Sequence, residues 1–379
     1  MKKIIYIGIG ILASVLILKV LILPKGTLRP ILTSERRSAL NPIISPHGDK
    51  IIFMYRSYRY ANCDGLYIVD FNGDNCKPII EGTNFADAGL ECAWSPNGKL
   101  ITFVMAGKIY LYEIENNSYL EIMAGSKPVW SFDGRGFAFI ATANVDRPVE
   151  AEGWLTERHE ILPAYNIKKV SVPLIMFYKV NDGSVSQMYE VRNFRSQLIQ
   201  HCLLDEKTLR LVMDSLSVQQ IIEKESWRRL EKRFAGWNII DIDIGTGMCK
   251  NALFIPSDND KIDFVSVSPN GKKALLFDRQ TVLLVEISNS IMEKIINSKV
   301  DRISWGRNGE SIFYDISNQI WMYNIANKNT RKITDFKGKI FSSLCENAGV
   351  FVIAAYLPTG DPEEDGYSER SVLFTGKIR

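Results

Sequence analysis

A short pattern of apolar and polar positions recurs along the chain. It consists of an apolar or aromatic residue, a polar turn containing glycine, and then a run of mostly apolar residues. The clearest copies are WSPNGKLITF at Trp94–Phe103 and VSPNGKKALLF at Val267–Phe277, and weaker copies begin at Ile44, Trp130 and Trp305. Polar clusters between apolar runs are typical of β-hairpins, and Asn-Gly or Asp-Gly pairs favour the positive φ of tight turns. The pattern therefore predicts a series of hairpins.

The turn glycines recur at a regular interval. The intervals are 50, 36, 38 and 40 residues over Gly48–Gly98, Gly98–Gly134, Gly271–Gly309 and Gly309–Gly349. One further copy at His201–Asp214 lies between Gly134 and Gly271, which makes seven turns in all. Four short strands repeated at about 40 residues are the signature of a β-propeller blade. In the clearest unit we predict strands at Leu90–Ser95, Lys99–Met105, Lys108–Glu115 and Tyr119–Gly125.

The last unit has only three apolar runs before the chain ends. The segment Thr27–Ser34 matches the outermost strands of other units in pattern and directly precedes the first inner strand. Pairing it with the last unit removes exposed sheet edges that would otherwise favour aggregation. We therefore predict an all-β, seven-bladed propeller of four-stranded antiparallel blades over residues 27–379, closed by its N-terminal strand.

The repeated Trp/Val-Ser-Pro-Asn-Gly-Lys phrase, followed by an apolar strand ending in Phe, resembles the propeller repeat of the TolB (WD40-like) type. The resemblance covers about Thr27–Arg379 and is strongest at Trp94–Phe103 and Val267–Phe277. Similar propellers occur as non-catalytic parts of prolyl-oligopeptidase-like enzymes. The resemblance implies the fold, but it specifies function poorly because such propellers serve as scaffolds, binders and enzyme appendages.

The N-terminus has the composition of a membrane anchor. Ile4–Leu23 is apolar except for Lys19, and a helix of this length spans roughly 30 Å of hydrocarbon. Lys2 and Lys3 precede it, which is typical of an export signal, and no small-residue cleavage site follows. We predict an uncleaved single-pass anchor in residues 1–26 with the propeller exported to the periplasmic or extracellular side. A removed signal peptide is the alternative.

Long insertions fall between the second and third strands of several units. They lie at about 56–65, 142–168, 215–237 and 357–369, and this position places them on one face of the propeller. The anchor joins the opposite face, so the insertions should point away from the membrane. We predict a helix at Val218–Phe234 within the third insertion; its apolar residues either face a partner or pack on the propeller.

The insertions contain side chains that dominate protein interfaces, namely Tyr, Trp, His and Arg. We predict partner binding by Arg56, Tyr58, Arg59, Tyr60, Trp154, Arg158, His159, Trp227, Arg228, Arg229 and Tyr367.

Composition narrows the remaining possibilities. The net charge of +3 over 379 residues suggests no basic surface for nucleic acid. Six cysteines without a CxxC or Cys/His cluster give no metal-ligand spacing, so no metal or cofactor is predicted. The phrase SFDGRGF at Ser131 departs from a sialidase Asp box, and we interpret Asp133 and Gly134 as a turn. No catalytic motif is found.

Two functions follow from these observations. The first is a membrane-anchored, non-enzymatic scaffold that binds protein partners in an envelope complex through the insertions. The alternative is a hydrolase or lyase acting on glycan or peptide, with carboxylates in the central funnel.

Overall fold

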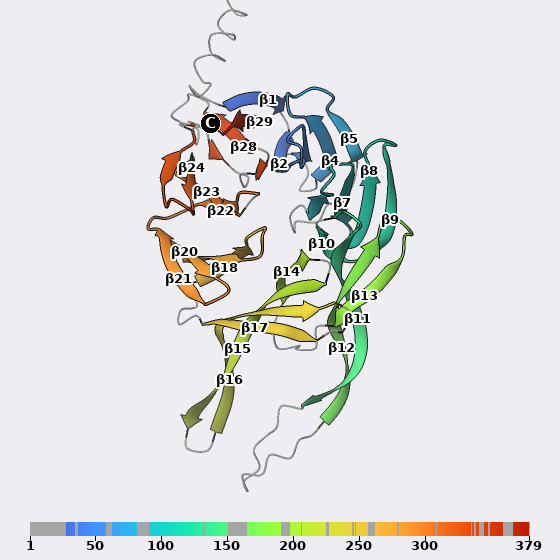
Figure 1. The fold of residues 1–379 in the computed structure, drawn as a ribbon, viewed down its shortest axis with the longest axis vertical. Helices are drawn as coiled ribbons and strands as arrows, with labels where there is room; N and C mark the ends of the chain where they lie inside the picture. The colour runs from blue at the N-terminus through green and yellow to red at the C-terminus, as the bar shows by residue number, and fades with distance from the viewer. Residues whose placement is uncertain are drawn as a thin grey trace, which may run out of the picture. The chain divides into compact units, whose positions relative to one another are not determined.

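The computed structural model describes residues 28–34, 37–57, 63–81, 91–131, 133–150, 165–190, 198–205, 207–224, 227–244, 246, 248–256, 262–278, 280–307, 309–334, 336, 339–340, 345–347, 349–358 and 367–378. These residues form strands, turns and irregular segments. The chain is an all-β, seven-bladed propeller with four-stranded antiparallel blades, as the repeat predicts (Figure 1).

The chain divides into two compact units. Unit 1 holds the described residues within Met1–Ala106, Leu111–Leu120 and Asn259–Arg379, and unit 2 holds those within Gly107–Tyr110 and Glu121–Asp258. Blades 1, 5, 6 and 7 lie in unit 1, and blades 3 and 4 lie in unit 2. Most of blade 2 belongs to unit 1.

In unit 1, blade 1 has the order β2-β3-β4-β5, with β2 at Arg37–Ile44, β3 at Lys50–Ser57, β4 at Cys63–Asp70 and β5 at Lys77–Glu81. Blade 2 comprises β6 at Cys92–Trp94, β7 at Leu100–Met105, β8 at Lys108–Glu113 and β9 at Ser118–Ala124. Blade 5 comprises β18 at Ile262–Val267, β19 at Lys273–Asp278, β20 at Thr281–Glu286 and β21 at Ile291–Ile296. Blade 6 comprises β22 at Arg302–Trp305, β23 at Ser311–Ile316, β24 at Gln319–Asn324 and β25 at Thr330–Lys332.

Blade 7 confirms the predicted closure by the N-terminal strand. Its innermost position is shared by two short strands, β26 at Lys339–Ile340 and β27 at Cys345–Asn347, which both pair with β28 at Val350–Pro358. β29 at Tyr367–Lys377 and β1 at Leu28–Ser34 complete the blade. The strand β1 pairs antiparallel with β29 from Leu28 opposite Gly376 to Ser34 opposite Ser371. Leu28 is buried in one core with Phe351 and Phe374. The edge of the last blade is thus covered by the first described segment of the chain.

The repeated Ser-x-Asn-Gly phrase is explained by its turn. In blade 2 the Ser95 hydroxyl donates to Asn97 Oδ1 at 2.8 Å, and Asn97 Oδ1 accepts the backbone N–H of Lys99 at 3.0 Å. Gly98 has a φ of +67°, which favours glycine because a side chain is strained there. Ser268 and Asn270 make the same arrangement in blade 5, with distances of 2.8 and 3.1 Å.

The tryptophans that begin the phrase connect neighbouring blades of unit 1. Trp94 Nε1 of blade 2 donates to the carbonyl oxygen of Ile43 in blade 1 at 3.3 Å. Trp305 Nε1 of blade 6 donates to the carbonyl oxygen of Ser266 in blade 5 at 3.4 Å. Both indoles therefore bury apolar surface between blades while their only polar group keeps a partner.

In unit 2, blade 3 comprises β10 at Ser126–Trp130, β11 at Gly136–Glu150, β12 at Tyr165–Lys179 and β13 at Val185–Glu190. Blade 4 comprises β14 at Leu198–Asp205, β15 at Thr208–Lys224, β16 at Trp227–Asp243 and β17 at Cys249–Pro256. The second and third strands of both blades are unusually long, and Figure 1 shows each pair continuing as a hairpin beyond the rest of its blade.

The helix predicted at Val218–Phe234 is wrong. This segment continues the β15–β16 hairpin, with Val218 opposite Lys232 and Ile221 opposite Arg229. An isolated helix must form a costly first turn, whereas each added strand pair extends a ladder that already exists at Thr208–Asp214. The β-branched residues Val218, Ile221 and Ile222 also suit a strand.

No helix long and apolar enough to cross a membrane occurs in the part of the chain that the structure describes. The predicted anchor at 4–23 lies outside the described residues.

His201 of β14 is a buried polar group in unit 2. Its side chain is 2% exposed, and neither ring nitrogen has a hydrogen-bond partner among the described residues. Burial lowers the pKa of His201 to about 4, and the nearby charge of Lys127 acts in the same direction. The native structure therefore holds the neutral imidazole.

The substitution Leu28→Ala should lower the free energy of unfolding by about 2 kcal/mol or more, because it opens a cavity where β1 closes blade 7. Leu120→Ala is the control, since Leu120 is 57% exposed and its loss should change stability by less than about 0.5 kcal/mol. Urea denaturation measures both. Equal effects of the two substitutions would show that β1 does not hold the blade.

The ordinary pKa of a histidine is 6.5, and that of His201 in the native chain is about 4. The stability of the native chain should fall as the pH drops from the first value to the second. The unfolded chain binds a proton in this window and the native chain does not, so the loss attributable to His201 reaches on the order of 3 kcal/mol. His201→Leu should remove that part of the pH dependence. Unfolding midpoints measured across the window for both proteins give the difference, and parallel curves would contradict the assignment.

Candidate functional site

The structure describes only some of the residues predicted to bind partners. Arg56 lies in β3, Trp227, Arg228 and Arg229 lie at the start of β16, and Tyr367 begins β29; for these residues only the backbone is described. The others, Tyr58, Arg59, Tyr60, Trp154, Arg158 and His159, lie outside the described residues. Partner binding by this set stays a prediction.

A large pocket lies in unit 2, between blades 3 and 4. Its volume is about 790 Å³, within the range of small-molecule and substrate sites. It is built by the turns after the first and third strands of blade 3, the outer strand β13, and the end of β14 in blade 4. β11 begins beside the pocket and ends in the long β11–β12 hairpin, so the pocket and this hairpin end lie at opposite ends of blade 3.

The floor of the pocket is apolar. It is formed by Phe177 of β12, Met188 of β13, Leu203 of β14 and Ile244 after β16. Leu203 is 6% exposed and belongs to the core shared by the two blades. A bulge in the β12–β13 pairing leaves Met188 as an extra residue between Gln187 and Tyr189, and both Gln187 and Met188 line the pocket.

The rim of the pocket is charged. Asp133 and Arg135 come from the β10–β11 turn, and Asp133 Oδ2 lies 2.9 Å from Arg135 Nε. Lys179 and Asp182 come from the β12–β13 connection, and Asp205 ends β14. Three carboxylates and two cations therefore surround the opening, a formal sum of −1.

All three rim carboxylates have lowered pKa values. The backbone N–H of Arg135 lowers the pKa of Asp133, hydrogen bonds from Ser184 lower that of Asp182, and the backbone N–H of Lys207 lowers that of Asp205. Each group is therefore ionised at neutral pH. Ionised carboxylates with low pKa values suit electrostatic binding better than general acid catalysis, which needs a proton near neutral pH.

The sequence did not predict this site, although Asp133 and Gly134 do form the predicted turn. Asp133 Oδ1 accepts the backbone N–H of Arg135 at 2.9 Å, and Gly134 has a φ of +70°. Asp133 takes the position that Asn97 and Asn270 take in other blades. The substitution of Asp for Asn at this position of the repeat was the available signal, but the sequence alone does not show that three such turns converge on one pocket.

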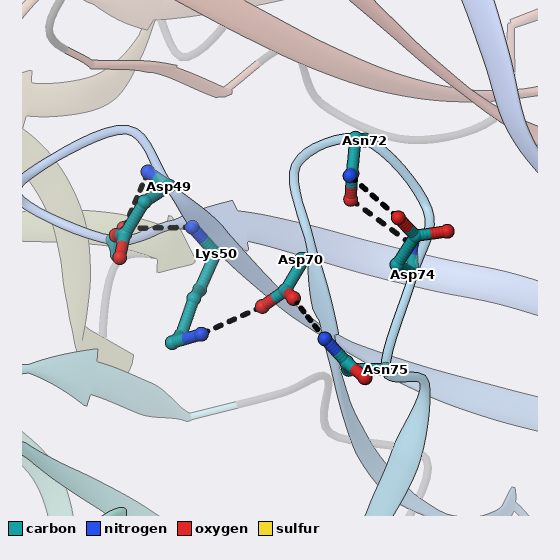
Figure 2. Close-up of polar contacts among 7 residues, drawn as sticks. Asp49, Lys50, Asp70, Asn72, Asp74 and Asn75 are labelled. Atoms are coloured by element: carbon teal, nitrogen blue, oxygen red, sulfur yellow. Dashed lines mark hydrogen bonds and ion pairs between the residues drawn. The ribbon is translucent and has the colours of Figure 1, made fainter.

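A second polar cluster lies in unit 1, where two turns of blade 1 meet (Figure 2). Lys50 Nζ and Asn75 Nδ2 each donate to Asp70 at 2.6 Å, and Asn72 Nδ2 donates to Asp74 Oδ2 at 2.7 Å. The hydrogen bond from Lys50 is the main cause of the lowered pKa of Asp70. These groups satisfy one another, so the cluster fixes the turns rather than presenting an open site.

The same turn also packs against the closing strand. Gly73 has a φ of +95°, and a Cβ atom there would lie 2.4 Å from the carbonyl oxygen of Ile31 in β1. The close approach explains why glycine occupies this position.

Metal ligation finds no support in the described part of the chain. No group of three or more His, Cys, Asp or Glu side chains lies close enough there to hold a metal ion.

Comparison with known proteins identifies the fold class. No protein-family model and no curated protein matches the chain. Among solved structures, an oligogalacturonate lyase in complex with manganese is similar with a TM-score of 0.57 at 10% identity, over 94% of this chain and 99% of that one.

Two further solved structures share the fold. The acylaminoacyl peptidase of Pyrococcus horikoshii is similar with a TM-score of 0.54 at 15% identity, over 86% of this chain and 51% of that one. The propeller domain of Cps50 (Swd1) from Myceliophteria thermophila has a TM-score of 0.53 at 9% identity, over 90% of this chain and 98% of that one. Such low identities show a shared fold and no more.

These similarities correct one expectation from the sequence. We expected a non-enzymatic protein because no catalytic motif was found, yet the similar propellers include a lyase and part of a peptidase. The lyase matches over nearly its whole length, so a propeller of this size is compatible with catalysis and the lack of a familiar motif does not argue against it.

Asp133→Asn should leave the stability of the protein unchanged, because Asn97 and Asn270 make the same turn bond elsewhere. Asp133→Ala should lower the free energy of unfolding by about 1 kcal/mol, because the Arg135 N–H loses its acceptor. Chemical denaturation of both variants checks this. If the Asn variant is as unstable as the Ala variant, the charge itself holds the turn.

Proposed function

We propose that this propeller is a hydrolase or lyase that acts on an oligomeric glycan or peptide, and that the pocket between blades 3 and 4 binds the substrate. The observation that carries the proposal is the pocket itself. Its volume of about 790 Å³, its apolar floor and its convergent charged rim are the features of a substrate site.

The lining divides into two roles. Phe177, Met188 and Leu203 offer apolar surface to the body of a substrate. Burial of that surface contributes to affinity but does not fix the orientation of the substrate. Asp182, Asp205 and Lys179 lie at the rim, where charge and hydrogen bonds orient what enters. Such binding fixes the position of an oligomeric substrate, so that a bond next to the bound unit is held in place for the reaction.

The fold gives independent support. The proposal is supported by the similarity to an oligogalacturonate lyase, whose chain is matched over 99% of its length. The TolB-type identity suggested by the repeated phrase belongs to the same proposal.

The cellular setting completes the proposal. The apolar segment Ile4–Leu23 anchors the chain in a membrane, and the propeller lies on the periplasmic or extracellular side. Glycans and peptides of the cell envelope are then within reach. The insertions, including Arg56 and Trp227, remain the surface proposed for protein partners.

The full chain, extracted in mild detergent, should release products from a defined mixture of oligopeptides or of neutral, amino and uronic oligosaccharides, as detected by mass spectrometry. Ser186→Trp should abolish that turnover, because Ser186 is exposed on β13 and lines the pocket, so an indole at this position would obstruct substrate binding.

Lys294→Trp is the matched control. Lys294 is exposed on β21, the outer strand of blade 5, and is not among the residues lining the pocket. Its substitution should leave turnover intact. The proposal fails if neither mixture yields products, or if the Ser186 variant turns over as fast as the native chain.

A further inference from the structure

Three carboxylates at the pocket occupy turn positions where other blades use asparagine. In the turn after the first strand, Asp133 and Asp205 accept the backbone N–H two residues later at 2.9 and 2.8 Å. Asn97 and Asn270 accept the corresponding N–H in blades 2 and 5 at 3.0 and 3.1 Å. The amide oxygen of asparagine therefore does the same structural work as the carboxylate.

The turn after the third strand repeats this relation. Asp182 of blade 3 accepts the backbone N–H of Ser184 at 2.9 Å. Asn289 in blade 5 and Asn327 in blade 6 accept the N–H two residues later at 3.1 and 3.0 Å. The turn needs an oxygen acceptor and does not need a charge.

A fourth aspartate, Asp243, ends β16 but does not line the pocket. It lies 3.2 Å from Lys250 Nζ, just as Asp133 lies 2.9 Å from Arg135 Nε, so a nearby cation does not distinguish it from the pocket carboxylates. The three pocket carboxylates differ in sharing one cavity while coming from three separate turns. The turn hydrogen bonds do not require these charges, and with Arg135 and Lys179 they give the charged side chains of the lining a formal sum of −1.

We propose that the pocket selects a peptide segment that carries a lysine or arginine side chain. This inference rests on the proposed function and narrows its substrate class. The apolar floor of Phe177, Met188 and Leu203 fits the aliphatic stem of such a side chain, and the rim carboxylates fit its charged end.

The charge of the rim disfavours the main alternatives. A polyanionic uronate chain would require more cations than carboxylates in the pocket. The lining has two cations and three carboxylates, and one of these cations, Arg135, is paired with Asp133. The three carboxylates do not form a group that could hold a metal ion. Charge spread around a cavity with an apolar floor suits an extended organic cation.

A binding experiment on the full chain tests this inference. The probe is a fluorescein-labelled peptide that alternates leucine and lysine, measured by fluorescence anisotropy at low and high salt, with an acidic leucine–glutamate peptide and oligogalacturonate as comparisons. The native chain should bind the basic peptide most tightly, and its affinity should fall as salt rises.

The triple variant Asp133→Asn, Asp182→Asn, Asp205→Asn should bind the basic peptide about tenfold more weakly or worse, since three rim charges are lost. Its salt dependence should be shallower. Its unfolding midpoint should be unchanged, because asparagine makes the same turn bonds in other blades.

The matched control reverses the same exchange outside the pocket. Asn97→Asp, Asn270→Asp, Asn327→Asp changes three turns of the same two kinds in unit 1 and should leave peptide affinity unchanged. The inference is overturned if the Asp-to-Asn variant binds the basic peptide like the native chain. Tighter binding of oligogalacturonate than of the basic peptide overturns it as well.

The two proposals fail in different ways. If Ser186→Trp abolishes turnover while the triple Asn variant keeps its peptide affinity, the pocket is the substrate site and only the charge selection is wrong. If the basic peptide binds as expected but Ser186→Trp leaves turnover unchanged, the pocket binds peptide and the catalytic proposal fails.

Discussion

The structure depends on one constraint, the tight turn that joins the first two strands of a blade. The chain must reverse within a few residues, and the glycine there adopts a positive φ, from +67° to +74° at Gly48, Gly98, Gly134, Gly271, Gly309 and Gly349. In blades 2, 3 and 5 a polar side chain before the glycine accepts a backbone N–H that the strand ladder leaves unpaired. Because the inner hairpin is set this way, the remaining strands of each blade add to a sheet of fixed register.

The same turn separates what the fold needs from what function adds. Asparagine and aspartate both accept the turn hydrogen bond, so a blade can change its surface charge without changing its backbone. In blades 3 and 4 this freedom gives a pocket with three ionised carboxylates above an apolar floor of Phe177 and Leu203. A repeat protein can thus change the charge of its surface through one atom of a turn side chain.

The insertions show a different use of the same architecture. In unit 2 the second and third strands of blades 3 and 4 extend into long hairpins, paired from Gly136 to Glu150 in β11 and from Thr208 to Lys224 in β15 (Figure 1). Extending an existing ladder satisfies backbone groups without a new core. The pocket lies at the other end of blade 3, so the two ends of this unit are free to serve separate roles.

The amino-acid sequence by itself determined the repeat, the number of blades and the closing strand Leu28–Ser34. These depend on local signals, namely glycine turns and apolar alternation, that act within a few residues and are copied along the chain. It did not determine the secondary structure of Val218–Phe234. The apolar spacing of this segment suits a helix, but its two halves pair with each other as strands. Nor did it reveal the pocket, because Asp133, Asp182 and Asp205 look like ordinary turn residues when taken singly. Only the packing of two blades brings them to one cavity, and proximity between distant turns is a property of the tertiary structure.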